Sequence, residues 1–152
     1  MTLRVYLDTC VYNRPFDDQT QPRIWLETLA FSIILQMLEA NTIHLISSTV
    51  VAYEISRNPH RLRRDWVEKV THLAVEQLRV NQTIRDRAIT LEGGGLTALD
   101  ALHLACAETA NTDYFITVDD RLNRRYQRFE PKDSILQVCD PTEFVRITGE
   151  NV

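Results

Sequence analysis

The 152-residue chain contains little cysteine. Its three cysteines, Cys10, Cys106 and Cys139, are odd in number, lie far apart and form no CxxC or cysteine–histidine spacing. Disulfide frameworks and structural zinc sites need paired or closely spaced ligands, so we interpret all three as buried thiols. The pattern argues against zinc and against a disulfide-stapled fold.

Long hydrophobic runs are also missing. No apolar stretch approaches the roughly 18 residues that a membrane span needs, and the opening MTLRVYLD lacks the basic region and apolar core of a signal peptide. We therefore expect a cytoplasmic protein with no membrane partner. There are no repeats, low-complexity segments or flexible linkers, so residues 1–152 are expected to form a single domain.

Lysine is scarce among the positive charges. Only Lys69 and Lys132 are lysines among the 17 cationic residues, and all others are arginine. Arginine binds phosphate groups through paired hydrogen bonds, but it is equally common in surface ion pairs. The net charge of −4 by itself argues against a passive nucleic-acid binder.

What the sequence does contain is an alternation of strand and helix patterns. Strands are expected at Leu3–Leu7 and in TIHLISS, YFITV and SILQVC, with a further short strand within 71–80. Helices are expected from Pro22 to about Asn41, in STVVAYEISR with Ser47 or Ser48 as its cap, near Leu62, near Gln82 and in LTALDALHLACAETAN. The stretch from Cys10 to Pro22 is expected to be a loop. This alternation predicts a parallel sheet covered by helices on both faces.

Four acids occupy positions where such a sheet places a site. Asp8 ends the first strand and Asp119 follows YFITV, and the working site of a parallel sheet lies beyond the C-terminal strand ends. Glu54 lies in an apolar stretch after the second strand, and Asp100 lies near the start of a later helix. Asp8, Asp100 and Asp119 each have a structural alternative as a turn or cap residue, and Thr97 with Asp100 matches a capping box. Glu54 has no such alternative.

Several acids in one pocket repel one another unless a cation compensates them. Oxygen ligands of this kind favour a hard divalent ion, Mg²⁺ or Mn²⁺, over a metal that needs histidine or cysteine. Such an ion polarises a phosphoryl oxygen and helps to deprotonate an attacking water. The acids together therefore predict phosphodiester hydrolysis.

Four segments in this order and at these distances resemble the PIN-domain nucleases, particularly bacterial toxins of the VapC type: YLDTCVYN, ISSTVVAYEI, LTALDALHLACAETA and FITVDDRL. The resemblance extends from about residue 3 to 144. It implies a three-layer α/β/α domain with a central parallel β-sheet of four or five strands, and Mg²⁺- or Mn²⁺-dependent cleavage of single-stranded RNA. We expect the toxin of a type II toxin–antitoxin pair, with a cognate antitoxin and a second copy of the chain in a homodimer as partners.

The resemblance assigns roles to individual residues. It implies that the catalytic acids are Asp8, Glu54, Asp100 and Asp119, and that Asp8, Asp100 and Asp119 bind the metal. Thr9, Thr117 and Asp120 are expected around these ligands, where hydroxyl groups orient carboxylates or metal-bound water. For Asp120, a helix cap and a water-mediated ligand remain open. His103, one helical turn after Asp100, is expected to lie within its helix without an acid–base role.

Two arginine groups, RNPHRLRR and RLNRRYQR, each begin shortly after a proposed site acid. Contacts with substrate phosphates are predicted for Arg57, Arg61, Arg121 and Arg124. Tyr126 is a candidate to stack on an unpaired base. Solvated faces and an antitoxin-binding surface remain alternatives for the arginines. The alternative to an enzyme is a catalytically silent PIN-like module that binds RNA or protein.

Overall fold

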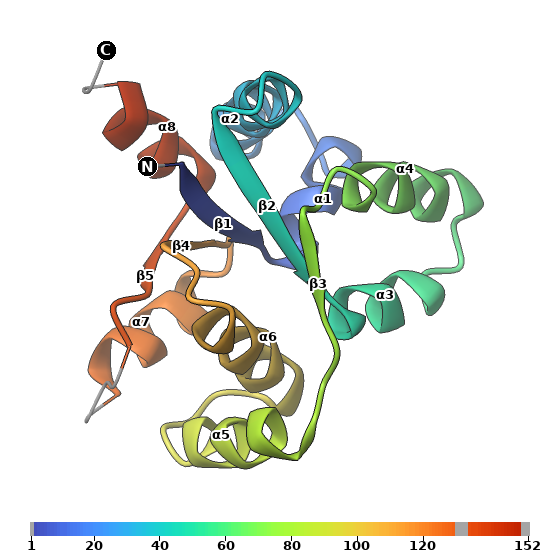
Figure 1. The fold of residues 1–152 in the computed structure, drawn as a ribbon. Coiled ribbons are helices and arrows are strands. Elements are labelled where there is room, and N and C mark those ends of the chain that lie inside the picture. The colour runs from blue at the N-terminus through green and yellow to red at the C-terminus, as the bar shows by residue number, and fades with distance from the viewer. Residues whose placement is uncertain (1, 130–133, 150–152) are drawn as a thin grey trace.

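A five-stranded parallel β-sheet forms the centre of the computed structural model, which describes residues 2–129 and 134–149 (Figure 1). The strands are β1 (Leu3–Leu7), β2 (Ile43–Ser48), β3 (Glu76–Leu78), β4 (Tyr114–Ile116) and β5 (Gln137–Cys139). Their order is β3-β2-β1-β4-β5, and each neighbouring pair is parallel. The strands β2 and β3 follow on one side of β1, and β4 and β5 lie on its other side, so the strand order reverses at β1. The C-terminal ends of β1 and β4 therefore border the crevice where such sheets bind ligands.

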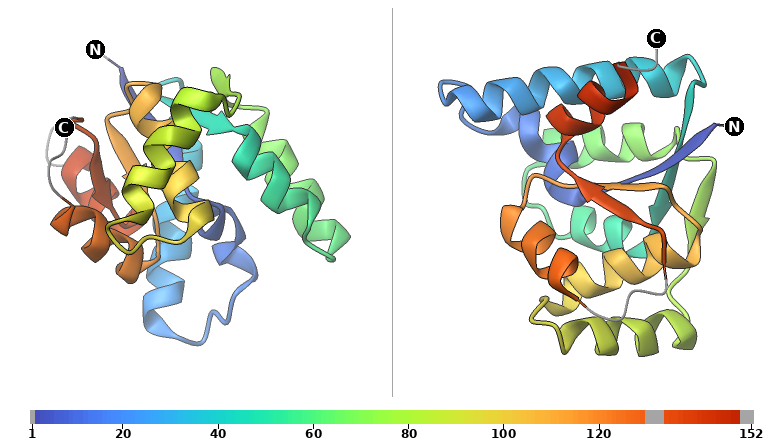
Figure 2. Two further views of the ribbon diagram at one scale, coloured as in Figure 1. Left: turned by 90° about the horizontal axis from the view of Figure 1, so that it is seen from below. Right: turned by 90° about the vertical axis from the view of Figure 1, so that its left-hand side faces the viewer.

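Helices cover both faces of this sheet, as Figures 1 and 2 show. The helices are α1 (Thr9–Asn13), the 3₁₀ turn η1 (Arg14–Phe16), α2 (Pro22–Glu39), α3 (Thr49–Ser56), α4 (Arg61–Thr71), α5 (Gln82–Glu92), α6 (Ala98–Thr109), α7 (Asp120–Arg128) and α8 (Pro141–Gly149). The pair α2 and α8 lies on one face, the pair α5 and α6 lies on the other, and α3 and α4 lie together beyond β3. The predicted three-layer α/β/α architecture is confirmed.

Local sequence explains where several elements begin. Pro22 occupies the first turn of α2, where its missing N–H is not needed. The hydroxyl of Ser48 caps α3 by accepting from the Val50 backbone N–H at 3.2 Å, which confirms the predicted cap. In the central strand β1, Val5 and Leu7 are completely buried because strands lie on both sides and helices cover both faces.

The expected loop between Asp8 and Pro22 is wrong in part, because it contains α1 and η1. The turn-forming residues there end these short helices, while Val11 and Tyr12 anchor α1 in the core with no exposed surface. The predicted helix from Pro22 is present as α2, and its buried face follows Ile24, Phe31, Ile34 and Leu38. Three further apolar residues of the helix, Trp25, Leu29 and Ile33, are exposed.

Within the described ranges, no helix combines the length and the apolar character required to cross a bilayer. All three cysteines are free thiols. Cys106 and Cys139 are buried as predicted, whereas Cys10 is only partly covered. Its position beside the C-terminal edge of the sheet brings it into the candidate site.

Candidate active site

Strand β1 delivers Asp8 to the C-terminal edge of the sheet. The Asp8 backbone N–H donates to the Ile116 carbonyl at 2.9 Å, so the ladder between β1 and β4 continues up to this residue. Asp8 precedes α1 as its N-cap, but its side chain makes no capping hydrogen bond. The carboxylate is 6% exposed and is directed to other side chains, which excludes the simple turn role.

Two donors fix one oxygen of the Asp8 carboxylate. The Thr117 hydroxyl donates to Oδ2 at 2.8 Å, and the Cys10 thiol donates to the same oxygen at 3.3 Å. The Asp119 backbone N–H in turn donates to the Thr117 hydroxyl at 3.0 Å. Burial, together with the charge of Asp8, raises the pKa of the Cys10 thiol well above its usual value, so the thiol stays protonated and keeps its role as a donor.

Glu54 approaches the same place from α3. The Thr9 hydroxyl donates to Glu54 Oε1 at 2.9 Å, and Nε2 of His103 contacts that oxygen as well. His103 Nε2 also lies 3.9 Å from Asp8 Oδ1. Ligand atoms of Asp8, Glu54 and His103 all lie within 4.8 Å of one another. The sequence interpretation gave His103 no part in the site, and its contact with two site acids is therefore new information.

The ring of His103 is oriented from behind by a buried tyrosine. Tyr6 Oη lies 2.6 Å from His103 Nδ1 and 2.6 Å from the Ser48 hydroxyl. Both ring nitrogens of His103 are therefore occupied, one by Tyr6 and the other by Glu54. This arrangement fixes the ring plane and directs Nε2 toward the acids.

The contact between His103 and Glu54 has the character of an ion pair. Burial alone would lower the pKa of His103, but the hydrogen bond to Glu54 and the charges of Asp8, Glu54 and Asp100 outweigh it and raise the pKa. Burial would raise the pKa of Glu54, but the hydrogen bond and charge of His103, with the Thr9 hydroxyl, lower it. The proton shared by this pair therefore resides on the histidine.

Burial and neighbouring negative charges both act on the Asp100 carboxyl. Thr97 caps α6 by accepting from the Asp100 backbone N–H at 3.2 Å. Burial and the charges of Asp8 and Asp119 raise the pKa of the Asp100 carboxyl to about 6, against opposing contributions from Thr97 and His103. Acids at such a site hold more negative charge than the surrounding protein compensates.

Asp119 has two functions at the start of α7. Its Oδ1 accepts from the backbone N–H groups of Arg121 at 2.9 Å and Leu122 at 3.2 Å, so Asp119 is the N-cap of that helix. The charge of the same carboxylate also acts on Asp100. The predicted alternative that Asp120 caps this helix is wrong, because the preceding residue performs that function.

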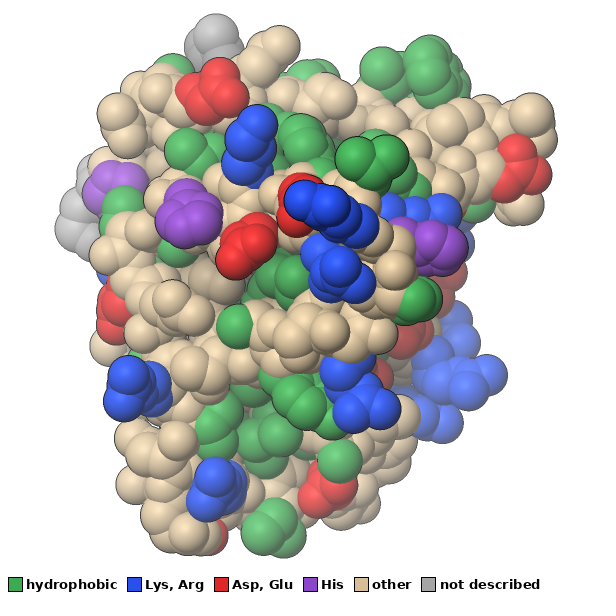
Figure 3. Space-filling model, turned by 90° about the vertical axis from the view of Figure 1, so that its right-hand side faces the viewer, with side chains coloured by type: hydrophobic (Ala, Val, Ile, Leu, Met, Phe, Trp, Pro, Cys, Tyr) green, Lys and Arg blue, Asp and Glu red, His purple; other side chains and the backbone are tan. Residues whose placement is uncertain are grey.

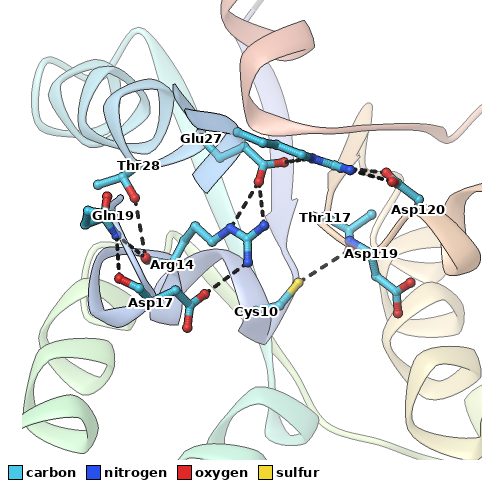
Figure 4. Close-up of polar contacts among 10 residues, drawn as sticks. Cys10, Arg14, Asp17, Gln19, Glu27, Thr28, Thr117, Asp119 and Asp120 are labelled. Atoms are coloured by element: carbon cyan, nitrogen blue, oxygen red, sulfur yellow. Dashed lines mark hydrogen bonds and ion pairs between the residues drawn. The ribbon is translucent and has the colours of Figure 1, made fainter. Parts of the chain in front are cut away.

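Asp120 lies at the end of a network of ion pairs (Figure 4). Its two oxygens accept from Arg23 Nη1 and Nη2 at 2.6 and 2.7 Å. Arg23 Nε lies 3.4 Å from Glu27, and Glu27 accepts from Arg14 Nε at 3.0 Å and Nη2 at 2.7 Å. Arg14 continues to Asp17 at 3.0 Å. The structure therefore places Asp120 on an arginine and not among the four proposed catalytic acids.

This network joins η1 and the start of α2 to the distant helix α7. Glu27 on α2 is 2% exposed and contacts both arginines, so its buried charge is well compensated. Asp120 carries the network to the first residue of α7. The sequence interpretation did not identify Arg14 or Glu27, and their only signal was the alternation of charges between residues 14 and 27.

The predicted phosphate-binding arginines lie on two sides of the acids. Arg57 follows α3 and places its Cζ atom 5.6 Å from the centre of the Tyr53 ring. Arg61 on α4 is exposed, with Nε 3.8 Å from Asp65. Arg121 and Arg124 are exposed on α7.

Tyr126 does not present its ring to solvent. It is fully buried, and its hydroxyl donates to Glu108 at 2.7 Å. The expectation that Tyr126 stacks on an unpaired base is therefore wrong. The helical period of α7 turns Leu122 and Tyr126 inward and the arginines outward.

The donor set suits a metal ion. Carboxylate oxygens gather beside one imidazole nitrogen in a partly closed site, and the raised pKa of Asp100 shows that additional positive charge would stabilise the group. Oxygen-rich sets of this kind favour hard divalent cations. Asp8, Glu54 and His103 thus bring together ligand atoms that could hold a metal ion, and the charges of Asp8 and Asp119 act on the nearby Asp100.

Comparison with known proteins identifies the family of the chain. The family model for the PIN domain matches residues 5–127. The chain therefore belongs to the PIN-domain family, as the four sequence motifs predicted. No curated protein matches the chain.

A solved structure shares the fold. The chain is similar to the crystal structure of VapBC2 from Rickettsia felis bound to a DNA fragment from their promoter, with a TM-score of 0.57 and 17% sequence identity. The match covers 91% of this chain and 98% of that one. At this identity, the likeness establishes a common fold.

Proposed function

We propose that this protein is a metal-dependent endoribonuclease that hydrolyses phosphodiester bonds of single-stranded RNA. The observation that carries the proposal is the group of acids at the C-terminal edge of β1 and β4, where Asp8, Glu54 and His103 converge and where burial, together with the charges of Asp8 and Asp119, raises the pKa of Asp100 to about 6. PIN domains are generally nucleases, and this chain belongs to that family. Grouping acids in one place is electrostatically unfavourable, and a role in catalysis accounts for it.

We assign metal binding to Asp8, Asp100 and Asp119, with Mg²⁺ or Mn²⁺ as the ion. When bound, such an ion polarises the phosphoryl group and lowers the pKa of an attacking water. Thr117 and Cys10 hold Oδ2 of Asp8, which leaves Oδ1 for the ion. The cap of α7 likewise uses Oδ1 of Asp119 and leaves Oδ2.

Glu54 is the proposed base. Its contact with the protonated His103 keeps it ionised, and Thr9 and His103 both meet Oε1. Oε2 then remains as the oxygen with which Glu54 accepts a proton from the attacking water. His103 acts on this step through Glu54, by supplying the positive charge that holds the carboxylate in its basic form.

The test of this function is cleavage by the purified protein. We expect cleavage of single-stranded RNA with Mg²⁺ or Mn²⁺, loss of cleavage in EDTA, and a roughly thousandfold or greater loss in Asp8→Asn and Asp100→Asn. Asp86→Asn, a change of an exposed acid on α5, is the matched control and should cleave normally. Activity that survives EDTA, or normal cleavage by the site variants, contradicts the proposal. Tight RNA binding without any cleavage would instead favour a catalytically silent module.

We also propose that the protein is the toxin of a type II toxin–antitoxin pair, acting in the cytoplasm. The support is the common fold with the VapBC2 structure, together with exposed apolar side chains on α2, where Trp25 is 50% exposed. Such surfaces are typical of binding sites for another protein chain, an antitoxin or a second copy of this chain.

Expression in a bacterial host tests the toxin proposal. We expect growth arrest on induction, and relief of the arrest when a small protein encoded beside this chain is produced with it. The Asp8→Asn variant should be harmless at the same level of expression. Arrest by that variant would show that the effect on growth does not come from cleavage.

A further inference from the structure

A second feature of the molecule lies beside the acids and has no part in the chemistry described so far. It is a hollow of about 320 Å³ between α3, α5 and α6. Its apolar lining consists of Val50, Tyr53, Val80, Leu99 and Leu102, and Arg85 contributes a positive charge. On the face drawn in Figure 3, hydrophobic side chains gather in the lower part, with lysine or arginine side chains at their edges.

The hollow and the acids lie on adjacent sides of the same two helices. On α3, Tyr53 lines the hollow and its neighbour Glu54 belongs to the acid site. On α6, Leu99 lines the hollow and its neighbour Asp100 belongs to the acid site. Successive Cα atoms are about 3.8 Å apart, and successive side chains point about 100° apart around a helix. A ligand that reaches both places therefore needs to bridge only a short distance.

The lining has the chemistry of a stacking surface. Tyr53 is 50% exposed and Leu99 is 37% exposed, so these side chains face solvent and not the core. The guanidinium of Arg57 lies over the Tyr53 ring, with its Cζ atom 5.6 Å from the ring centre. Flat aromatic and guanidinium groups are the surfaces on which unpaired bases stack.

The charge beside the hollow suits a nucleic acid. Its lining contains no acidic residue, and Arg85 forms no ion pair with any residue in the described part of the chain. Arg57 likewise contacts the Tyr53 ring in preference to a carboxylate. Two cations beside a small apolar hollow can bind the phosphates on either side of one base.

We propose that this hollow binds one unpaired nucleobase next to the phosphodiester that is cleaved. Tyr53 stacks on the base, and Arg57 and Arg85 bind the flanking phosphates. The inference rests on the proposed nuclease function and specifies how its substrate is held. The hollow has a volume at the lower end of sites for small ligands, which suits a single base. A protein partner would have to cover a much larger surface around it, about 800 Å².

The first experiment measures RNA binding without cleavage. The Asp8→Asn protein is titrated, in metal-free buffer, with a fluorescent single-stranded RNA oligomer and with an oligomer of equal length that lacks its bases. We expect the natural oligomer to bind more tightly, and this ratio of affinities to fall about tenfold when Tyr53→Ala is added. The ratio should be retained in Tyr53→Phe, which keeps the ring. Phe16→Ala, a change of another exposed aromatic residue on η1, is the control and should leave the ratio unchanged.

A second experiment locates the base relative to the cut. In the wild-type protein with Mn²⁺, a single abasic position moved along the oligomer should suppress cleavage at one fixed distance from itself. Tyr53→Ala should abolish that dependence and raise KM more than it lowers kcat, because the stacking contact positions the substrate. An unchanged dependence in Tyr53→Ala, or an unchanged ratio of affinities in the binding experiment, overturns the proposal.

Two further measurements separate the remaining possibilities. Sedimentation of wild type and Tyr53→Ala should give the same mass. A change from dimer to monomer overturns the proposal, because a second copy of the chain then covers the hollow.

Arg85→Gln should weaken the binding of the natural and the base-free RNA oligomer by the same factor, since it removes a phosphate contact. Unchanged binding of both oligomers refutes that contact. The binding experiment does not depend on catalysis, so a base-dependent affinity without any RNA cleavage would refute the nuclease function alone.

Discussion

Asp119 and Asp120 are neighbours in the sequence but belong to two regions with opposite electrostatics. Asp119 lies with Asp8 and Asp100, where acids act on one another and the pKa of Asp100 rises to about 6. Asp120 is paired with Arg23, and that hydrogen-bonded contact lowers the pKa of its carboxyl. Unmatched acids indicate a place where an external cation is needed, and matched acids indicate structure. This difference is the reason why we propose a functional role for Asp119 and a structural role for Asp120.

The largest expected effect distinguishes these two neighbours directly. Asp119→Asn should reduce RNA cleavage by roughly a thousandfold or more, because it removes a proposed metal ligand. Folding should be nearly unchanged, since asparagine caps a helix about as well as aspartate. Cleavage assays combined with urea denaturation test both parts. Loss of activity that merely follows loss of folded protein would assign Asp119 to the structural region.

Breaking the ion-pair network should affect stability next most strongly. Glu27→Gln should lower the free energy of unfolding by about 3 kcal/mol, because Arg14 loses its buried charged partner. Urea denaturation measures this change, and cleavage per folded molecule should stay near that of wild type. A loss below about 1 kcal/mol would show that solvent compensates the arginines without Glu27.

The acid site should make the metal-free protein less stable as the pH rises. A folded-state pKa of about 6 exceeds the ordinary value of 3.8 for Asp100, so its stabilising contribution is complete below pH 3.8 and is lost as the pH rises through 6. Asp100→Asn should therefore be more stable than wild type at neutral pH, by about 1–2 kcal/mol once solvent screening of this partly exposed carboxyl is allowed for. The two proteins should converge near pH 4.

Urea denaturation of wild type and Asp100→Asn between pH 4 and pH 7.5 measures that difference. Comparing the two proteins isolates Asp100 from other groups such as His103. Saturating Mn²⁺ should stabilise wild type more than the variant at pH 7. A stability difference that does not change with pH would mean that neither burial nor the charges of Asp8 and Asp119 perturb Asp100.

The smallest effect is expected for the outer member of the network. Arg23 and Asp120 are both about half exposed, with side-chain exposures of 51% and 52%, so their ion pair is open to solvent. Asp120→Asn should cost no more than about 1 kcal/mol in unfolding free energy and should change cleavage only slightly. A loss of cleavage comparable with that of Asp119→Asn would place Asp120 in the acid site and remove the distinction between the two regions.

Much of the fold was predictable because its signals are local. Apolar runs predicted four of the five strands at least approximately, and the ends of two of these strands pointed to Asp8 and Asp119. The fifth strand, β3, contains no apolar run, and the pattern of residues 71–80 was ambiguous. The cap at Ser48 was predictable because it involves only adjacent residues. The short α1 was missed because its stability comes from burial of Val11 and Tyr12 in the tertiary structure and not from helix signals of its own.

The site was predictable only in part, for a related reason. Motif order identified the four acids, but the contact between His103 and Glu54 joins residues from two helices that are 49 positions apart. The choice between Tyr126 and Tyr53 as an exposed ring likewise depends on which face of a helix meets the core. Predicting these contacts requires knowledge of how the helices pack together, and a single segment of sequence does not carry that information.

The sequence by itself determined the alternation of strands and helices, the family, and the set of acids at the strand ends. These follow from residue periodicity and from motif order along one chain. Only the tertiary structure decided that Asp120 joins an ion-pair network while Asp119 caps α7 and acts on Asp100. The physical reason is that electrostatic compensation depends on distance in space: Arg23 meets Asp120 across 97 positions of sequence, while Asp119 stays beside the Thr117 hydroxyl that also holds Asp8.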